Sequence, residues 1–90
     1  MKLPARATLD EAAALLAMLE NELAGAGQGE VFELDASALQ EVDSSALALM
    51  IEAHRLCAQR GLRFRASGLP AKLSELARLY GVESLLSPVA

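Results

Sequence analysis

Apolar residues recur at the spacing of an α-helix in the first third of the chain. The predicted apolar face consists of Leu9, Ala12, Leu16, Leu19 and Leu23. Thr8 and Glu11 open this run as a Thr-x-x-Glu capping box, in which Glu11 reaches back to the amide of the cap residue. Glycines at positions 25, 27 and 29 then interrupt the pattern. The sequence therefore predicts a first helix between Thr8 and Gly25.

Two later segments have the alternation that is typical of β-strands. Residues 30–35 read Glu-Val-Phe-Glu-Leu-Asp, and residues 62–66 read Leu-Arg-Phe-Arg-Ala, with one apolar and one basic face. Residues 1–7 have room for one further strand, in which Pro4 is tolerated only at an edge or at the strand start. We therefore expect three strands before the end of the chain is considered.

Between the two later strands the pattern predicts a loop and then a second helix. Residues 36–42 form the expected loop, with Leu39 and Val42 pointing inward. Residues 46–60 carry a helical apolar face, and Gly61 follows as a C-cap. That predicted face consists of Leu47, Met50, Ile51, His54 and Ala58.

A third helix is predicted from Pro70, whose fixed backbone angle suits the first position of a helix, to Gly81. Its predicted face consists of Leu73, Leu76, Ala77 and Tyr80. Residues 82–86 predict either a last short strand or a docked tail. The alternation of strands and helices indicates an α/β fold with a mainly parallel sheet of three to four strands, packed by three helices.

Length and composition predict a single globular domain that is soluble. Ninety residues leave room for a single core, so we expect one domain over residues 1–90. The 53% hydrophobic content excludes disorder, and the 3% aromatic content argues against an all-β sandwich. The longest apolar runs are far short of a membrane span, and no signal peptide opens the chain. We therefore expect a cytoplasmic protein without direct membrane insertion.

Charge points to a protein partner more than to nucleic acid. The formal net charge is −4, and no basic stripe exists for binding nucleic acid. Residues 1–54 carry a net charge of −8 and residues 55–90 a net charge of +4. Such an uneven distribution suits docking to another protein. Ordinary solvated helix faces explain it equally well.

Candidate catalytic and metal-binding groups are few. His54 is the only histidine, and it falls within the apolar face of the second helix, which favours a core or half-buried position. Cys57 is the only cysteine and has no identifiable base partner, so we interpret it as a small buried apolar residue. No histidine or cysteine pair has metal-ligand spacing, and no phosphate-binding glycine motif is present. We expect no enzyme activity, no cofactor and no metal.

Asp43, Ser44 and Ser45 place an acid and two hydroxyls at the start of the second helix, after a strand and its loop. In α/β sheets this junction is where ligands and partners tend to bind. A phosphate on Ser44 would be stabilised by the first-turn amides but repelled by Asp43 and Glu41. The simpler interpretation is that Asp43 or Ser44 is only the N-cap, which contributes about 1 kcal/mol.

The segment around these residues resembles the STAS domain family. Residues 34–49 read Leu-Asp-Ala-Ser-Ala-Leu-Gln-Glu-Val-Asp-Ser-Ser-Ala-Leu-Ala-Leu, and a helix, Gly61 and a strand follow. Anti-sigma-factor antagonists of this family carry a similar Asp-Ser-Ser/Thr-Gly-Leu segment. The similarity runs from about residue 30 to residue 86 in the family's element order, and it implies a small STAS-like fold.

Two segments are similar to the MlaB branch of that family. Residues 43–49 read Asp-Ser-Ser-Ala-Leu-Ala-Leu, and residues 76–82 read Leu-Ala-Arg-Leu-Tyr-Gly-Val. MlaB proteins are small cytoplasmic subunits of a phospholipid-transporting ABC complex at the bacterial inner membrane. The resemblance implies that this chain binds the ATPase subunit, peripheral to that membrane. The whole complex serves outer-membrane lipid asymmetry.

The resemblance also assigns roles by position. Ser44 matches the regulatory hydroxyl, and Asp43 matches the acid before it. The residues that the second and third helices are expected to present to the ATPase are Asp43, Ser44, Ser45, Leu47 and Tyr80. Ala46 stands where the antagonists have glycine, which favours the transporter subunit. The alternative is an anti-sigma-factor antagonist controlled by phosphorylation at Ser44.

The N-terminus departs from the family pattern. STAS domains usually open with two strands, whereas residues 1–7 have room for only one. A bare sheet edge is therefore expected, and exposed edges invite pairing with another chain. A homodimer joined through that edge stays open as a further interpretation.

Overall fold

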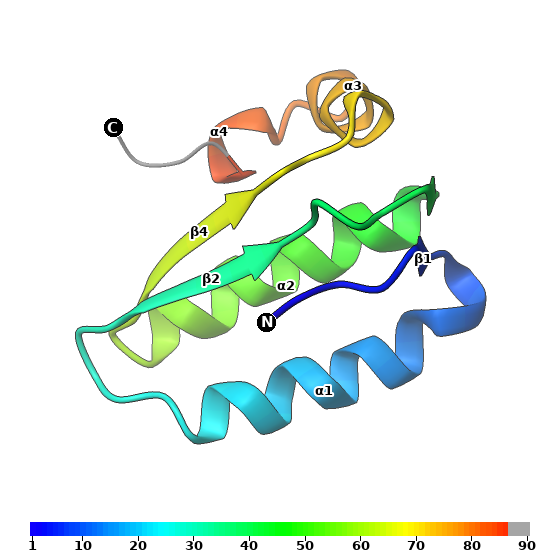
Figure 1. Cartoon of the computed structure of the whole chain (residues 1–90). Coiled ribbons are helices and arrows are strands. Elements are labelled where there is room, and N and C mark those ends of the chain that lie inside the picture. The colour runs from blue at the N-terminus through cyan, green and yellow to red at the C-terminus, as the bar shows by residue number, and fades with distance from the viewer. Residues whose placement is uncertain (87–90) are drawn as a thin grey trace.

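The computed structural model describes residues 1–86 and places strands and helices in the predicted alternating order (Figure 1). The elements are β1 (Arg6–Ala7), the 3-10 turn η1 (Leu9–Glu11), α1 (Ala12–Ala24), β2 (Val31–Asp35), β3 (Glu41–Val42), α2 (Ser44–Gln59), β4 (Arg63–Ser67), α3 (Ala71–Leu79) and α4 (Glu83–Leu86). The strand pairs are all parallel. The α/β class is therefore confirmed, with a short fourth helix added at the end.

The N-terminal segment pairs with two strands in turn. The Leu3 N–H donates to the Asp35 carbonyl, and the Asp35 N–H donates to the Met1 carbonyl, both at 2.8 Å. Beyond Pro4, which has no N–H to donate, β1 pairs instead with β3. The single strand expected over residues 1–7 is thus divided at Pro4. The strands form two short parallel ladders rather than one sheet.

The β2–β4 ladder is the larger of the two. Its register runs from Val31 opposite Arg63 to Asp35 opposite Ser67. Residues 1–3 pair with the other side of β2 at its C-terminal end, at Glu33 and Asp35. Within residues 1–86, β4 is therefore the strand of this ladder that pairs on one side only.

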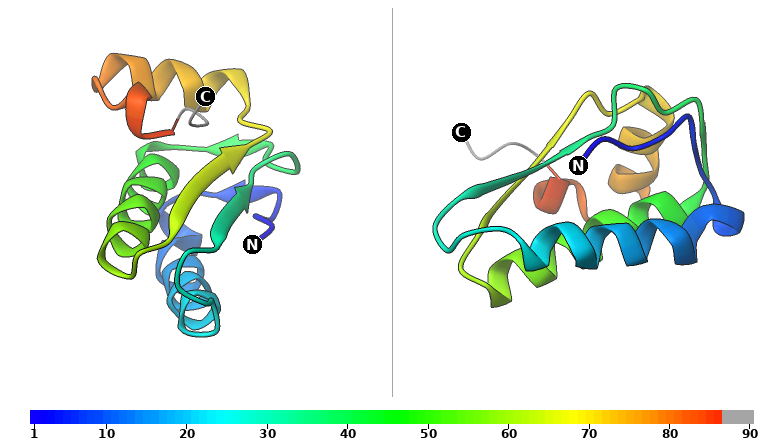
Figure 2. Two further views of the ribbon diagram at one scale, coloured as in Figure 1. Left: turned by 90° about the vertical axis from the view of Figure 1, so that its left-hand side faces the viewer. Right: turned by 60° about the horizontal axis from the view of Figure 1, so that its bottom comes forward.

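The core lies between this ladder and the helices, which cover one of its faces (Figure 2). Phe32, Leu34 and Ala66 are buried on the inner face, as strand alternation predicts. Arg63 and Arg65 are exposed on the outer face, so the basic face predicted for this strand is confirmed. The expected loop before α2 ends in β3, and both of its inward-pointing residues, Leu39 and Val42, are buried.

The buried face of α1 is rotated from the predicted one. It consists of Leu15, Leu19 and Leu23. Leu9 lies in η1 and is 74% exposed, while Ala12 and Leu16 are only partly buried. Because alanine and leucine occupy almost every position from residue 12 to residue 19, periodicity alone does not define one face there. Only the packing partner decides which leucines enter the core.

α2 lies between α1 on one side and α3 with α4 on the other (Figures 1 and 2). Its buried residues are Ala46, Leu47, Leu49, Met50, Ala53 and Cys57. Ile51 and His54 are only partly buried, and Ala58 is exposed, so the predicted face was in part wrong. Neighbours on several sides bury a broader face than one helical stripe.

The C-terminal helices pack against α2. In α3, Leu73 and Ala77 are buried, whereas Tyr80, placed on that face by the sequence, is 58% exposed. Residues 82–86 form no strand: α4 is a helical turn docked against α2 and α3. Of the two alternatives for this segment, the docked tail is therefore confirmed.

Candidate functional site

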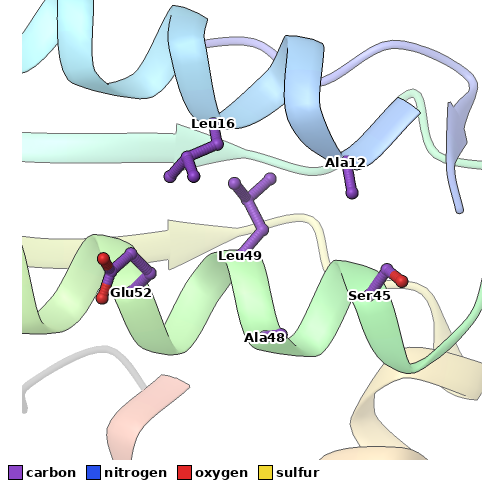
Figure 3. A pocket seen from close by; sticks show the side chains of 6 residues that line it. All are labelled: Ala12, Leu16, Ser45, Ala48, Leu49 and Glu52. Carbon is purple, nitrogen blue, oxygen red and sulfur yellow. The ribbon is translucent and has the colours of Figure 1, made fainter. Parts of the chain in front are cut away.

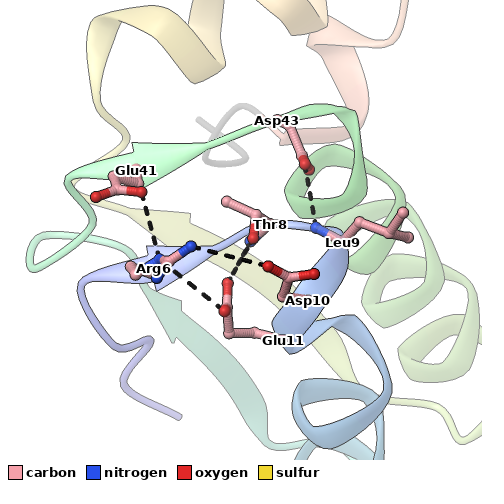
Figure 4. A network of polar contacts seen from close by, with 7 residues as sticks. All are labelled: Arg6, Thr8, Leu9, Asp10, Glu11, Glu41 and Asp43. Carbon is pink, nitrogen blue, oxygen red and sulfur yellow. Dashed lines mark hydrogen bonds and ion pairs between the residues drawn. The ribbon is translucent and has the colours of Figure 1, made fainter.

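Asp43 organises the start of α2 through both of its carboxylate oxygens (Figure 4). Oδ1 accepts the Ser45 N–H at 2.8 Å, which makes Asp43 the N-cap of the helix. Oδ2 accepts the Leu9 N–H at 3.1 Å, which ties the first residue of η1 to the same carboxylate. The backbone hydrogen bonds from Leu9 and Ser45 lower the pKa of Asp43, so the carboxylate stays charged to a lower pH than that of an ordinary aspartate.

A second cluster holds η1 beside this cap. The Thr8 N–H donates to Glu11 Oε1 at 2.9 Å, and the Thr8 hydroxyl donates to the same oxygen at 2.7 Å. Glu11 thus reaches back to the cap amide as predicted, and the hydrogen bond from the Thr8 backbone lowers the pKa of Glu11. Arg6 lies among three carboxylates, 3.3 Å from Glu41 and 4.0 Å from both Asp10 and Glu11.

Ser44 is the first residue of α2, and its side chain is exposed. The first-turn amides of α2 give this position a partial positive charge. Lys72, in the first turn of α3, adds a favourable charge interaction with Asp43. A negative group at Ser44 therefore meets attraction from the helix start and repulsion from the Asp43 carboxylate.

The structure brings together only part of the residue set expected at the partner surface. Asp43, Ser44 and Ser45 are consecutive at the start of α2. Leu47 is 3% exposed and packs in the core, so its side chain does not reach the surface. Tyr80 is exposed, but it follows the last residue of α3, whereas the first turn of α3 is the part that acts on Asp43.

A groove between α1 and α2 adjoins this start and was missed in the sequence (Figure 3). It has a volume of about 280 Å³ and is lined by Ala12, Leu16, Ser45, Ala48, Leu49 and Glu52. Periodicity had assigned Ala12 and Leu16 to the core-facing side of the first helix. The sequence signal for the groove is a pair of small residues, Ala12 and Ala48, on the two helices. It predicts a groove only when the two helices are already known to pack together.

The remaining chemical groups serve packing. The His54 ring meets the Phe64 ring edge-on, with centroids 5.9 Å apart. Cys57 is buried, and burial raises the pKa of its thiol. Across residues 1–86, no three His, Cys, Asp or Glu side chains form a group able to hold a metal ion. In the same range, every helix is too short or too polar to cross a membrane.

Comparison with protein families gives one match of nearly full length. The family described as "Mlab, STAS domain" matches residues 1–87. No curated protein matches the chain. The match extends the similar region to the N-terminus, so it includes β1 and α1, which the resemblance of residues 30–86 had left out.

Proposed function

The chain belongs to the STAS domain family, in its MlaB-type branch, and from this premise we propose that it binds the ATPase subunit of a phospholipid-transporting ABC complex. In general, STAS domains are non-enzymatic and act in protein–protein interactions. In this role the chain supports the assembly or activity of the ATPase. It works in the cytoplasm, peripheral to the inner membrane, in a complex that serves outer-membrane lipid asymmetry.

The accessible start of α2 is the observation that carries this proposal. Ser44 is exposed, and Asp43 beside it is fixed by amides from two separate elements. A surface held in this way loses little conformational freedom when a partner binds, which favours affinity. In the proposed complex, the partner also contacts Ser45 in the first turn of α2 and Tyr80 directly after α3.

A charge placed at Ser44 tests the proposal. We expect Ser44→Asp to weaken binding to the purified ATPase subunit from the same organism about 5- to 150-fold, because it adds a second acid beside Asp43 at the contact. Ser44→Ala removes only a hydroxyl and changes the affinity by a few-fold at most. Calorimetric titration measures both values.

Gln59→Glu provides the matched control, since it adds one negative charge at the exposed far end of α2. It leaves the affinity unchanged if the partner contacts the start of the helix. Equal affinity for the wild type, Ser44→Asp and Gln59→Glu would place the helix start outside the interface. No binding of the wild type to the ATPase would refute the proposed function itself.

The exposed position of Ser44 supports a second candidate function, an anti-sigma-factor antagonist controlled by serine phosphorylation. The first-turn amides of α2 and Lys72 favour a phosphate at this position. Incubation with serine kinases of the same organism, followed by intact-mass measurement, then adds one phosphate, and Ser44→Ala abolishes it. An unmodified wild-type mass removes this candidate.

A further inference from the structure

The groove between α1 and α2 is an apolar surface that the fold leaves open. Leu16 and Leu49 point toward each other across it, and the small side chains of Ala12 and Ala48 leave the space beside them unfilled (Figure 3). Its volume of about 280 Å³ lies just below the roughly 300–1,000 Å³ of small-molecule sites. A groove of this kind accepts side chains from a helix laid along it.

One end of the groove is continuous with the start of α2. Ser45 lines the groove, and its N–H is capped by Asp43. Leu9 is bound to the same carboxylate through its amide, and its side chain is 74% exposed (Figure 4). The apolar surface therefore extends to the helix start that the proposed function assigns to the partner.

The charges around the groove are acidic. Residues 9–24 contain no lysine or arginine. Of their four acids, Asp10 and Glu11 lie near Arg6, and Glu22 lies 3.8 Å from the Met1 amine, which leaves Glu20. Glu20 follows Leu16 by four residues and so lies on the same face of α1. Glu52 lines the groove from α2. Apolar side chains that enter this groove are therefore best flanked by cations.

Two arginines near the groove, Arg55 and Arg6, are already paired with acids of the chain itself. Arg55 donates to both carboxylate oxygens of Glu52, at 2.6 and 2.8 Å. Arg6 is shared among the three carboxylates next to η1. Glu20, in contrast, is an exposed acid on a helix that has no basic residue. An incoming basic side chain therefore finds Glu20 available as a counter-charge.

We propose that this groove receives an amphipathic helix of the ATPase subunit, an inference that rests on the proposed function. Apolar side chains one helical turn apart enter between Leu16 and Leu49. A lysine or arginine side chain beside them faces Glu20. The partner then covers a continuous surface from the groove to Ser44.

Filling the groove tests the proposal with the full chain and the purified ATPase subunit. Ala48→Trp occupies the space at an exposed position of α2, and we expect it to weaken binding at least tenfold. Ala58→Trp is the matched control, because Ala58 is also exposed on α2 but does not line the groove. It changes the affinity less than twofold. Circular dichroism and the Tm of both variants establish that they fold.

Charge reversal gives a second measurement that does not depend on packing in the groove. Glu20→Lys is at an exposed position and weakens the same complex about tenfold at low salt. The difference from the wild type shrinks as the salt concentration rises, because screening removes the attraction. A fall in affinity that is the same at all salt concentrations contradicts a basic occupant.

Three outcomes overturn the inference and are distinguishable. If Ser44→Asp weakens binding while Ala48→Trp and Glu20→Lys do not, the groove stays empty in the complex and only the proposed function stands. If the wild type does not bind the ATPase, both fail. If the isolated chain sediments as a dimer that Ala48→Trp dissociates, the groove holds a second copy of this chain.

Discussion

Asp43 does two structural tasks with one carboxylate, and this makes it the most sensitive polar residue of the site. One oxygen caps α2 and the other binds the first amide of η1. Its removal leaves two helix-start amides without that acceptor. Asp43 therefore also fixes the position of Ser44, which follows it as the first residue of α2.

Replacement of Asp43 tests this double role. We expect Asp43→Ala to lower the Tm by roughly 4–8 °C, because both helix starts lose their acceptor. Asp43→Asn keeps one oxygen acceptor and lowers the Tm by about half as much. Thermal unfolding followed by circular dichroism measures both. Equal Tm values for the two variants would contradict a role for the second oxygen.

Glycines that follow β4 and α3 offer a matched pair of substitutions at positive φ. Gly68 has a φ of 66°, and a Cβ there would lie 2.8 Å from the Ser37 backbone. Gly81 has a φ of 72° with no atom within 4 Å of a Cβ. Both alanine variants carry the same backbone strain, and only Gly68→Ala adds a clash between the loops that follow β2 and β4.

Gly81→Ala is therefore expected to cost about 1–2 kcal/mol of the free energy of unfolding. Gly68→Ala costs roughly 1–3 kcal/mol more, because the two loops must move apart. Urea unfolding of the two variants measures the difference directly. Equal losses would mean that the loop around Ser37 gives way without cost.

At the scale of elements, the rotation of α1 has an energetic consequence. Leu19 is completely buried, whereas Leu16 borders the groove and is only partly buried. We expect Leu19→Ala to cost about 2–5 kcal/mol and Leu16→Ala less than about 2 kcal/mol. Urea unfolding of both variants compares them. Equal costs would return Leu16 to the core face that the sequence predicted.

The sequence predicted those parts of the fold that depend on local signals. Capping residues, glycine stops and strand alternation are local signals, and they predicted the three main helices and both long strands. Which face of α1 is buried, and whether Tyr80 is exposed, depend on the elements that pack against each helix. Periodicity alone therefore predicted both incorrectly. Division of the N-terminal strand at Pro4 depends on long-range pairing with β2 and β3.

In the candidate site, too, the sequence predicted the local contacts and missed the long-range ones. Asp43, Ser44 and Ser45 were predictable as a helix start because capping chemistry is local. The second partner of Asp43, the amide of Leu9, is 34 residues away in the chain. No local pattern indicates such a contact. The groove beside it requires two helices to be placed together, so it too emerges only in three dimensions.

At the scale of the whole molecule, carboxylates link stability to pH. Hydrogen bonds and ion pairs of the folded state lower the pKa of five acids, namely Glu11, Glu33, Asp35, Asp43 and Glu52. When these pKa values are lowered, the unfolded chain binds more protons than the folded chain in the acid range. The free energy of unfolding therefore falls as the pH falls.

The pH window of this effect follows from the ordinary pKa values of 3.8 for Asp and 4.5 for Glu. Stability from these groups is fully present above those values and is lost as the pH drops through the lower folded-state pKa values. We expect the urea midpoint to hold between pH 7 and about pH 5.5 and to decline steadily toward pH 3. Asp43→Asn removes one of the contributing acids, so its midpoint starts lower and declines less steeply. A wild-type midpoint that stays constant to pH 3 would contradict the hydrogen bonds to these five acids. If those bonds lower the pKa values, the unfolded chain takes up more protons than the folded chain between about pH 5 and pH 3, and the midpoint must fall.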